Sequence, residues 1–277
     1  MSERGVTVTS EALPAGRVLR RPRAGAKTEV AVQLLSPLVL LAIWEITARA
    51  GYVDQRFYPA PSSIIQAFWE AVTTGVLLHH LKITLGRLAL GTLIGGLPAV
   101  LLGLAMGLSR WLRLALDPII AATYPLPKSA LFPLLLLIFG LGEGSKVAMV
   151  AIGVFYLAVT NSMEGVLAIN PVYLDVAKTF GARRLDVVRT VALPGALPLV
   201  LAGLRLGVGT GLILGVLAEM LGARDGLGYL LWSAWQTFSV SSLYAVLFVT
   251  AVLGFVSVKV VDILRRWLVP WQSGSRN

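Results

Sequence analysis

The sequence has no cysteine, only two histidines and few charged residues. The absence of cysteine excludes disulfide bridges and thiolate metal sites, and it leaves the redox compartment undetermined. Charged residues make up 14% of the 277 residues, whereas hydrophobic residues make up 56%. This balance is too apolar for an ordinary soluble enzyme of this length, and it predicts a chain whose solvent is a lipid bilayer.

Sequence signatures of catalysis are also missing. The phosphate-binding pattern G-x-x-x-x-G-K-[ST] does not occur, and the glycine-rich residues 140–146 have the wrong spacing for it. Neither H-E-x-x-H nor G-x-S-x-G occurs, and no ligand-type residue is spaced against His79 and His80 to make them a metal pair. We therefore expect no enzyme activity, no bound cofactor and no metal ion in this chain.

Six long apolar runs are present. A membrane-crossing helix needs about 20 mostly apolar residues to span a hydrocarbon core of roughly 30 Å. The runs cover residues 32–50, 81–108, 116–141, 147–168, 194–221 and 242–268. They lack the period-two alternation of outer-membrane strands, so helices are favoured over a barrel. The predicted fold class is an all-α membrane protein with about six transmembrane helices.

Basic residues gather in connections that lie on one side of this arrangement. Residues 1–30 carry six cations, residues 109–115 carry two and residues 171–194 carry four, whereas the opposite connections carry few. The positive-inside rule then places both chain ends in the cytoplasm of a bacterial-type cell, and six crossings agree with a common side. We expect residues 1–30 to form a flexible basic tail, with a cleaved targeting sequence as the lesser alternative, and residues 271–277 a short C-terminal tail.

A short helix is predicted on the outer side, after Pro59 and Pro61. Ser63 and Gln66 have the spacing of a capping box. An apolar stripe follows, formed by Ile64, Ile65, Phe68, Trp69 and Val72. This pattern indicates a helix lying in the outer membrane interface.

The longest connection on the basic side, residues 170–193, has the pattern of an amphipathic helix. Asn170 suits the N-cap and Pro171 the first helical position, while Gly181 is placed to end the helix in a left-handed turn. One face is apolar, formed at positions i, i+3, i+4 and i+7 by Tyr173, Val176, Ala177 and Phe180. A second short helix is expected from about Leu185 to the next crossing. Two interpretations are open: a helix resting on lipid, or a docking element received in a groove of a soluble partner.

This connection resembles the hallmark of the membrane subunits, or permeases, of ABC importers. That hallmark is Glu-Ala-Ala, three residues, Gly, nine residues and then Ile-x-Leu-Pro. Here Asp175-Val176-Ala177 is followed at the same spacing by Gly181 and then by Val191-Ala192-Leu193-Pro194. Further segments resemble the nitrate/sulfonate/taurine branch of these permeases: residues 58–62, 107–111, 125–128 with 139–142, and 218–223 with 226–229.

The resemblance implies a type I ABC importer permease domain over residues 31–270, with residues 170–193 as its coupling loop. It also implies a cytoplasmic ABC ATPase dimer that binds ATP and Mg²⁺, an extracytoplasmic substrate-binding protein and a second permease copy, as a homodimer or a heterodimer. The residues it assigns to ATPase coupling are Tyr173, Asp175, Val176, Ala177, Phe180, Gly181, Leu193 and Pro194.

The resemblance favours a small anion as cargo, such as a sulfonate, taurine or nitrate. A vitamin precursor or another small molecule is the alternative substrate. Composition and crossing number fit an ion-gradient-driven secondary transporter or a channel equally well, but such a protein has no reason to hold the coupling-loop spacing.

Charged residues inside the crossings are candidates for function or for pairing. They are Lys128, Glu164, Arg205 and Glu219. Lys128 lies beside two helix-breaking prolines, so it is a candidate to line a pathway for an anion. Gly207, Gly211 and Gly215 recur every four residues before Glu219, a spacing that lets helix backbones touch in lipid. They indicate a translocation path, a dimer seam or ordinary helix packing.

Overall fold

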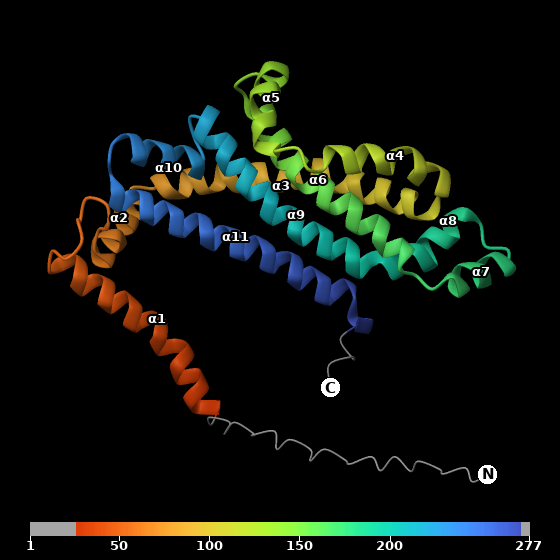
Figure 1. The fold of residues 1–277 in the computed structure, drawn as a ribbon, viewed down its shortest axis with the longest axis horizontal. Coiled ribbons are helices and arrows are strands. Elements are labelled where there is room, and N and C mark those ends of the chain that lie inside the picture. The colour runs from red at the N-terminus through yellow and green to blue at the C-terminus, as the bar shows by residue number, and fades with distance from the viewer. Residues whose placement is uncertain (1–25, 273–277) are drawn as a thin grey trace, which may run out of the picture.

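The computed structural model describes residues 26–272, which form helices and their connections without a β-strand (Figure 1). The expected all-α fold is confirmed. Residues 1–25 and 273–277, to which most of the two predicted tails belong, lie outside the described residues. In chain order the elements are α1 (Ala26–Arg49), α2 (Pro61–Thr73), α3 (Val76–Leu108), α4 (Arg110–Thr123), the 3-10 helix η1 (Lys128–Leu131), α5 (Phe132–Phe139), α6 (Glu143–Leu167), α7 (Pro171–Thr179), α8 (Arg184–Val187), the π-helix η2 (Val188–Ala192), α9 (Leu193–Gly222), α10 (Leu227–Gln236), α11 (Val240–Leu268) and the 3-10 helix η3 (Pro270–Gln272).

Four of the described helical segments are long and apolar enough to cross a membrane. They are α3, α6, α11 and the segment Leu185–Gly222, which contains α9. Another of the predicted crossings, residues 32–50, coincides with α1, whose 24 residues are about 36 Å long at 1.5 Å per residue. With the bent pair Arg110–Thr123 and Lys128–Phe139 counted as one span, up to five of the described segments are long and apolar enough to cross a membrane, and α1 is not among them.

The third predicted crossing, residues 116–141, is not one continuous helix. It is split into α4 and the segment Lys128–Phe139, which bend by 93° at the break. Pro125 and Pro127 stand in this break, where each removes a backbone N–H donor and disfavours helix in the residue before it. The two pieces form one broken span or a re-entrant segment.

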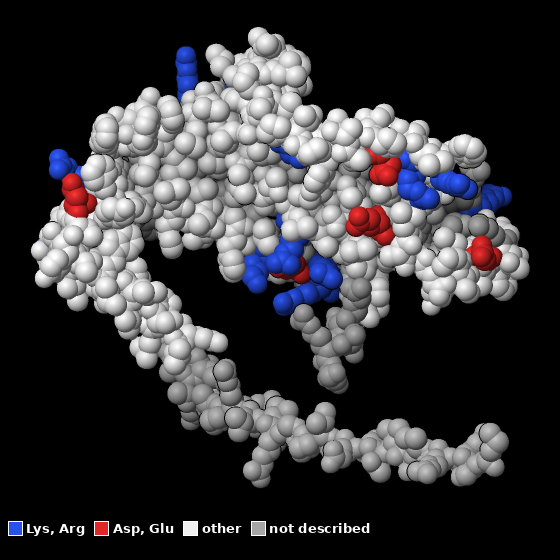
Figure 2. Space-filling model, viewed as in Figure 1, with Lys and Arg blue, Asp and Glu red and all other residues white. Residues whose placement is uncertain are grey.

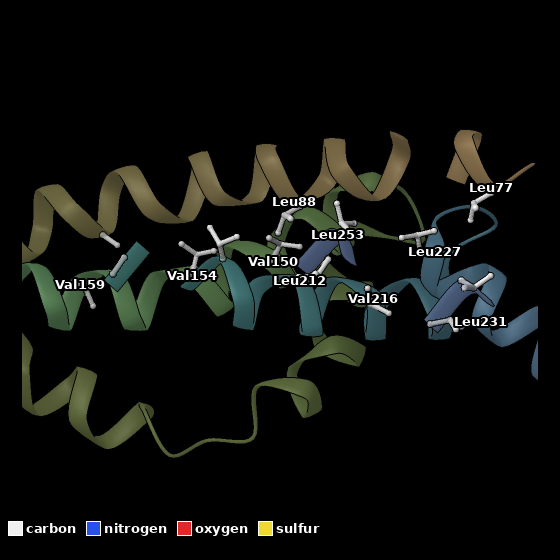
Figure 3. Close-up of a cluster of buried hydrophobic side chains, with 14 of the residues drawn as sticks. Leu77, Leu88, Val150, Val154, Val159, Leu212, Val216, Leu227, Leu231 and Leu253 are labelled. Atoms are coloured by element: carbon white, nitrogen blue, oxygen red, sulfur yellow. The ribbon is translucent and has the colours of Figure 1, made fainter. Parts of the chain in front are cut away.

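The core of the molecule is formed by α3, α6 and α9, which pack closely along their lengths. Glycines allow this approach: a Cβ on Gly103 of α3 would lie 2.6 Å from the Cβ of Ser162 of α6. Figure 3 shows Leu88 of α3, Val150 of α6 and Leu212 of α9 in one shared cluster of buried side chains. The three helices are therefore expected to move as one rigid unit.

The other elements surround this unit and separate its two ends. Helices α7 and α8 lie at one end, and α2 and α10 lie at the other (Figure 1). Most of the face shown in Figure 2 carries no charged side chain, as expected of a surface in contact with lipid. Helix α1 leaves the bundle beside α2, and large apolar side chains along it, such as Leu38 and Leu40, are exposed.

The predicted outer helix is present as α2, but the capping box predicted at Ser63 and Gln66 is not formed. The N-cap is Ala60, which makes no side-chain cap, and Pro61 stands in the first helical turn. Ser62 instead bonds to Glu45 of α1, through its N–H at 3.0 Å and its hydroxyl at 2.8 Å. The preset backbone of Pro61 starts the helix ahead of Ser63.

Candidate functional site

The predicted coupling loop has the local structure expected from its sequence. The N–H of Val172 donates to the side-chain oxygen of Asn170 at 3.0 Å, which confirms the N-cap. Helix α7 ends at Thr179, and Gly181 follows with φ +73°, in the left-handed region that favours glycine. A Cβ on Gly181 would have no atom of this chain within 4 Å, so any crowding there must come from outside the described chain.

The second part of the loop leads directly into a core helix. The predicted second helix is α8, and it continues through the π-helix η2 into α9. The backbone N–H of Arg183 donates to the carboxylate of Asp186 at 3.1 Å and fixes the start of α8. Leu193 and Pro194, the last two residues of the hallmark, form the first turn of α9. The chain is therefore helical without a break from α8 to α9.

Part of the apolar face formed by α7 and Phe180 lines a cavity, and the rest is exposed. Three of its four residues line a cavity of about 640 Å³ at the base of the loop, together with Pro194 and the C-terminal Trp271: Tyr173, Val176 and Ala177. Phe180 is not in this lining and is 86% exposed. The sequence did not point to Trp271, which reaches this hollow only because α11 runs back along the bundle.

A buried charge cluster occupies the opposite end of the core. Arg87 of α3 and Glu219 of α9 pair at 2.9 Å, with side chains only 5% and 1% exposed. Arg87 also binds both carboxylate oxygens of Glu143, at 2.6 and 2.7 Å, and the carboxylate of Asp225 at 2.5 Å. These two carboxylates are more open, at 66% and 37% exposure, so the cluster extends from the core to the surface.

Every polar group at the centre of this cluster has a partner. The five N–H donors of Arg87 are matched by five hydrogen bonds, the last of them to the carbonyl of Asp225. Glu219 also accepts from the hydroxyl of Thr84 and from the backbone N–H of Gly228, both at 2.9 Å. The cluster therefore ties α3, α6, α9 and the start of α10 into one unit.

Sequence reasoning found only part of this cluster. Glu219 was expected to lie on a path or in helix packing, and it lies at the centre of the ion pairs. Arg87 was missed, although a lone arginine inside the predicted crossing 81–108 is itself a signal of buried pairing. Glu143 and Asp225 are distant in the sequence, and only the packing of the helices brings them to Arg87.

The glycine series of α9 lies against α6 of the same chain. A Cβ on Gly207 would come within 3.1 Å of the Val154 backbone, one on Gly211 within 3.0 Å of the Val154 side chain, and one on Gly215 within 2.7 Å of Val150. These distances correspond to the helix-packing interpretation of the spacing.

Lys128 and Arg205 do not lie together. Lys128 donates to the carbonyl of Tyr124 at 2.9 Å, and its ammonium lies 4.8 Å from the ring centroids of both Tyr124 and Tyr156. Arg205 is half exposed and forms an ion pair of 3.3 Å with Asp262 of α11. Arg205 therefore links α9 to α11, whereas Lys128 is held between two aromatic rings.

Comparison with known proteins agrees with this architecture. The family described as "Binding-protein-dependent transport system inner membrane component" matches residues 99–274. The chain is 32% identical to a putative aliphatic sulfonates transport permease of Bacillus subtilis, over 87% of each chain, and 32% identical to the taurine transport system permease of Escherichia coli, over 88% of this chain and 90% of that one. It is 29% identical to a formylaminopyrimidine transport permease of Halalkalibacterium halodurans, over 85% and 93%.

A solved structure shares the fold. The MetNI methionine ABC transporter in an inward-facing conformation contains a chain that aligns with a TM-score of 0.64 at 18% identity, covering 71% of this chain and 97% of that one. The apolar helices, the family match and the relatives agree, and the resemblance predicted from the coupling-loop spacing is confirmed. This chain belongs to the family of multi-pass inner-membrane permease components of binding-protein-dependent ABC transport systems.

Proposed function

We propose that this chain forms the path of a small solute through the inner membrane, and that α7 and α8 receive the movement of a cytoplasmic ATPase. The observation that carries the proposal is the continuity of the coupling loop with α9. Because α9 packs on α6 through glycines and valines, a force on α8 turns the three-helix core as one body.

Exposure of the loop leaves part of its apolar face available to a docking protein. Phe180 is the most exposed residue of the apolar face, and the adjoining Gly181 has open space around it. A groove in a partner receives such a protruding aromatic side chain, and the glycine lets the partner's backbone approach closely. We assign the docking contact to Phe180, Gly181 and the exposed edge of Tyr173.

The remaining partners follow from the family. The ATPase binds ATP and Mg²⁺ on the basic, cytoplasmic side, where we place both chain ends. A substrate-binding protein delivers the solute at the opposite end, beside α2 and α10. A second permease copy completes the path, and the exposed apolar side chains of α1 offer surface for it or for lipid.

The cargo is a small solute, and two classes have support. Identity with sulfonate and taurine permeases supports the predicted small anion. Sequence similarity to a formylaminopyrimidine permease supports a solute with a nitrogen-rich ring instead.

A pair of variants at Gly181 tests the coupling proposal. In proteoliposomes with the ATPase and the binding protein, Gly181→Trp is expected to leave ATP hydrolysis running while solute uptake falls at least tenfold. Gly181→Asn is the control, because asparagine tolerates a positive φ and adds little bulk. Normal uptake by the tryptophan variant contradicts the docking assignment. Uptake by the purified chain without any ATPase supports a gradient-driven transporter and overturns the proposal.

A further inference from the structure

A second cavity lies between α4 and α6, separate from the coupling loop and the buried charge cluster. Its volume is about 390 Å³. It is lined by Asp117, Ile120, Ala121, Tyr124, Leu157, Thr160, Asn161 and Glu164. Figure 2 shows acidic side chains at the surface over this α4 and α6 region. The cavity therefore combines two carboxylates, an aromatic ring and neutral polar groups.

Hydrogen-bond acceptors outnumber donors in this lining. The hydroxyl of Thr160 donates to the carbonyl of Tyr156 at 2.9 Å, and the amide of Asn161 donates to the carbonyl of Leu157 at 2.8 Å. The side-chain oxygens of both residues remain acceptors, as do the carboxylates of Asp117 and Glu164. A solute here is bound best through its own N–H donors.

The charged side chains that line this cavity are both acidic, Asp117 and Glu164. Among the described residues that line it, none is a lysine or an arginine. The ammonium of Lys128 lies nearby, where it donates to the Tyr124 carbonyl and contacts two tyrosine rings, but Lys128 is absent from the lining. An anion would meet two carboxylates in the lining itself, whereas the cation of Lys128 lies outside it, and like charges at short range repel.

The position of these groups indicates a path rather than a lipid-facing surface. Helix α6 is apolar enough to cross the membrane, and α4 belongs to the broken span. Charged side chains on crossing helices face the protein interior or a water-filled space, and broken spans line such spaces. Asp117 and Glu164 are exposed in the single chain, so their face turns to water or to a second permease copy.

We infer that this cavity is a solute-contacting site on the transport path and that it selects a flat, nitrogen-rich solute presenting N–H donors, such as an aminopyrimidine. The ring stacks on Tyr124, and its N–H groups donate to Glu164, Asp117 and Asn161. Nitrate and simple alkanesulfonates lack such donors and are disfavoured. The inference rests on the proposed permease function, because it makes the α4–α6 face part of the path.

Ligand binding by the full chain in lipid nanodiscs tests the inference without any ATPase. The probes are 4-amino-2-methylpyrimidine, methanesulfonate and nitrate, each titrated by calorimetry. The aminopyrimidine is expected to bind, and Glu164→Gln and Tyr124→Leu are each expected to weaken it about tenfold or more. Glu70→Gln, at an exposed glutamate of α2, is the matched control and should leave binding unchanged.

Each other outcome overturns the inference. Binding of methanesulfonate or nitrate in preference to the aminopyrimidine reverses the assigned selectivity. Binding of none of the probes, or binding that Glu164→Gln and Tyr124→Leu leave intact, removes the site from this cavity. The binding measurement uses the permease alone, so a negative result leaves the Gly181 test of ATPase coupling unaffected. A negative result in the Gly181 test likewise leaves the binding measurement interpretable.

Discussion

Replacing Arg87 with methionine tests whether the buried charge cluster holds the core helices together. Methionine keeps much of the length of the side chain and removes its charge. Glu219 would then be a carboxylate only 1% exposed, with the Thr84 hydroxyl and one backbone N–H as its remaining partners. Removing one partner of a buried ion pair costs about 3–5 kcal/mol of folding free energy.

This cost can be measured as a loss of thermal stability. Each kcal/mol lowers the unfolding midpoint by about 2–4 °C in a chain of this size, so Arg87→Met should lose roughly 6–20 °C. The assay is thermal unfolding of the purified chain in nanodiscs, followed by circular dichroism. Arg56→Met is the matched control, because Arg56 pairs with Asp54 at 3.1 Å on the exposed surface, where loss of an ion pair should leave the midpoint unchanged.

A second variant separates charge burial from simple loss of contacts. In Arg87→Met combined with Glu219→Leu, the buried carboxylate is gone, while Glu143 and Asp225 can reach water. The double variant should therefore be more stable than the sum of the two single changes predicts, by about 0.5–3 kcal/mol. An Arg87→Met midpoint equal to that of the Arg56 control, or strict additivity in the double variant, refutes the reasoning.

Two further predictions concern glycines and use the same thermal assay. Gly226→Ala should lower the unfolding midpoint strongly, because the φ of Gly226 is +104° and a Cβ there would lie 2.5 Å from the carboxylate oxygens of Glu219. Gly51→Ala is the control: the φ of Gly51 is +78° and a Cβ there would have no atom within 4 Å. It should therefore carry only the backbone cost of about 1–2 kcal/mol. Equal losses would mean that the contact with the glutamate does not matter. Gly103→Ala should destabilise the packing of α3 on α6, whereas Gly86→Ala, with open space in the same helix, should be neutral or stabilise by up to about 1 kcal/mol. Matching effects at the two positions would contradict close packing at Gly103.

The short local features of this protein could be predicted because each depends on neighbouring residues. Asn170 and Pro171 start α7, and Gly181 ends it, since capping and a positive φ are decided within one turn of chain. The apolar runs predicted the helices for the same reason: length and hydropathy alone settle what a bilayer accepts. The capping box at Ser63 failed because two local signals competed and Pro61 prevailed.

The sequence alone therefore predicted the membrane fold, the helix and turn of residues 170–193 and the family, since spacing along the chain carries all three. Tertiary structure alone decided the partners of each intramembrane charge. Arg87 meets Glu143, Glu219 and Asp225 across three helices and a loop, and Lys128 is held between two tyrosine rings. The reason is physical: charge in a low-dielectric interior must find a compensating group at a few ångströms, and helix packing, not sequence distance, determines which groups come that close.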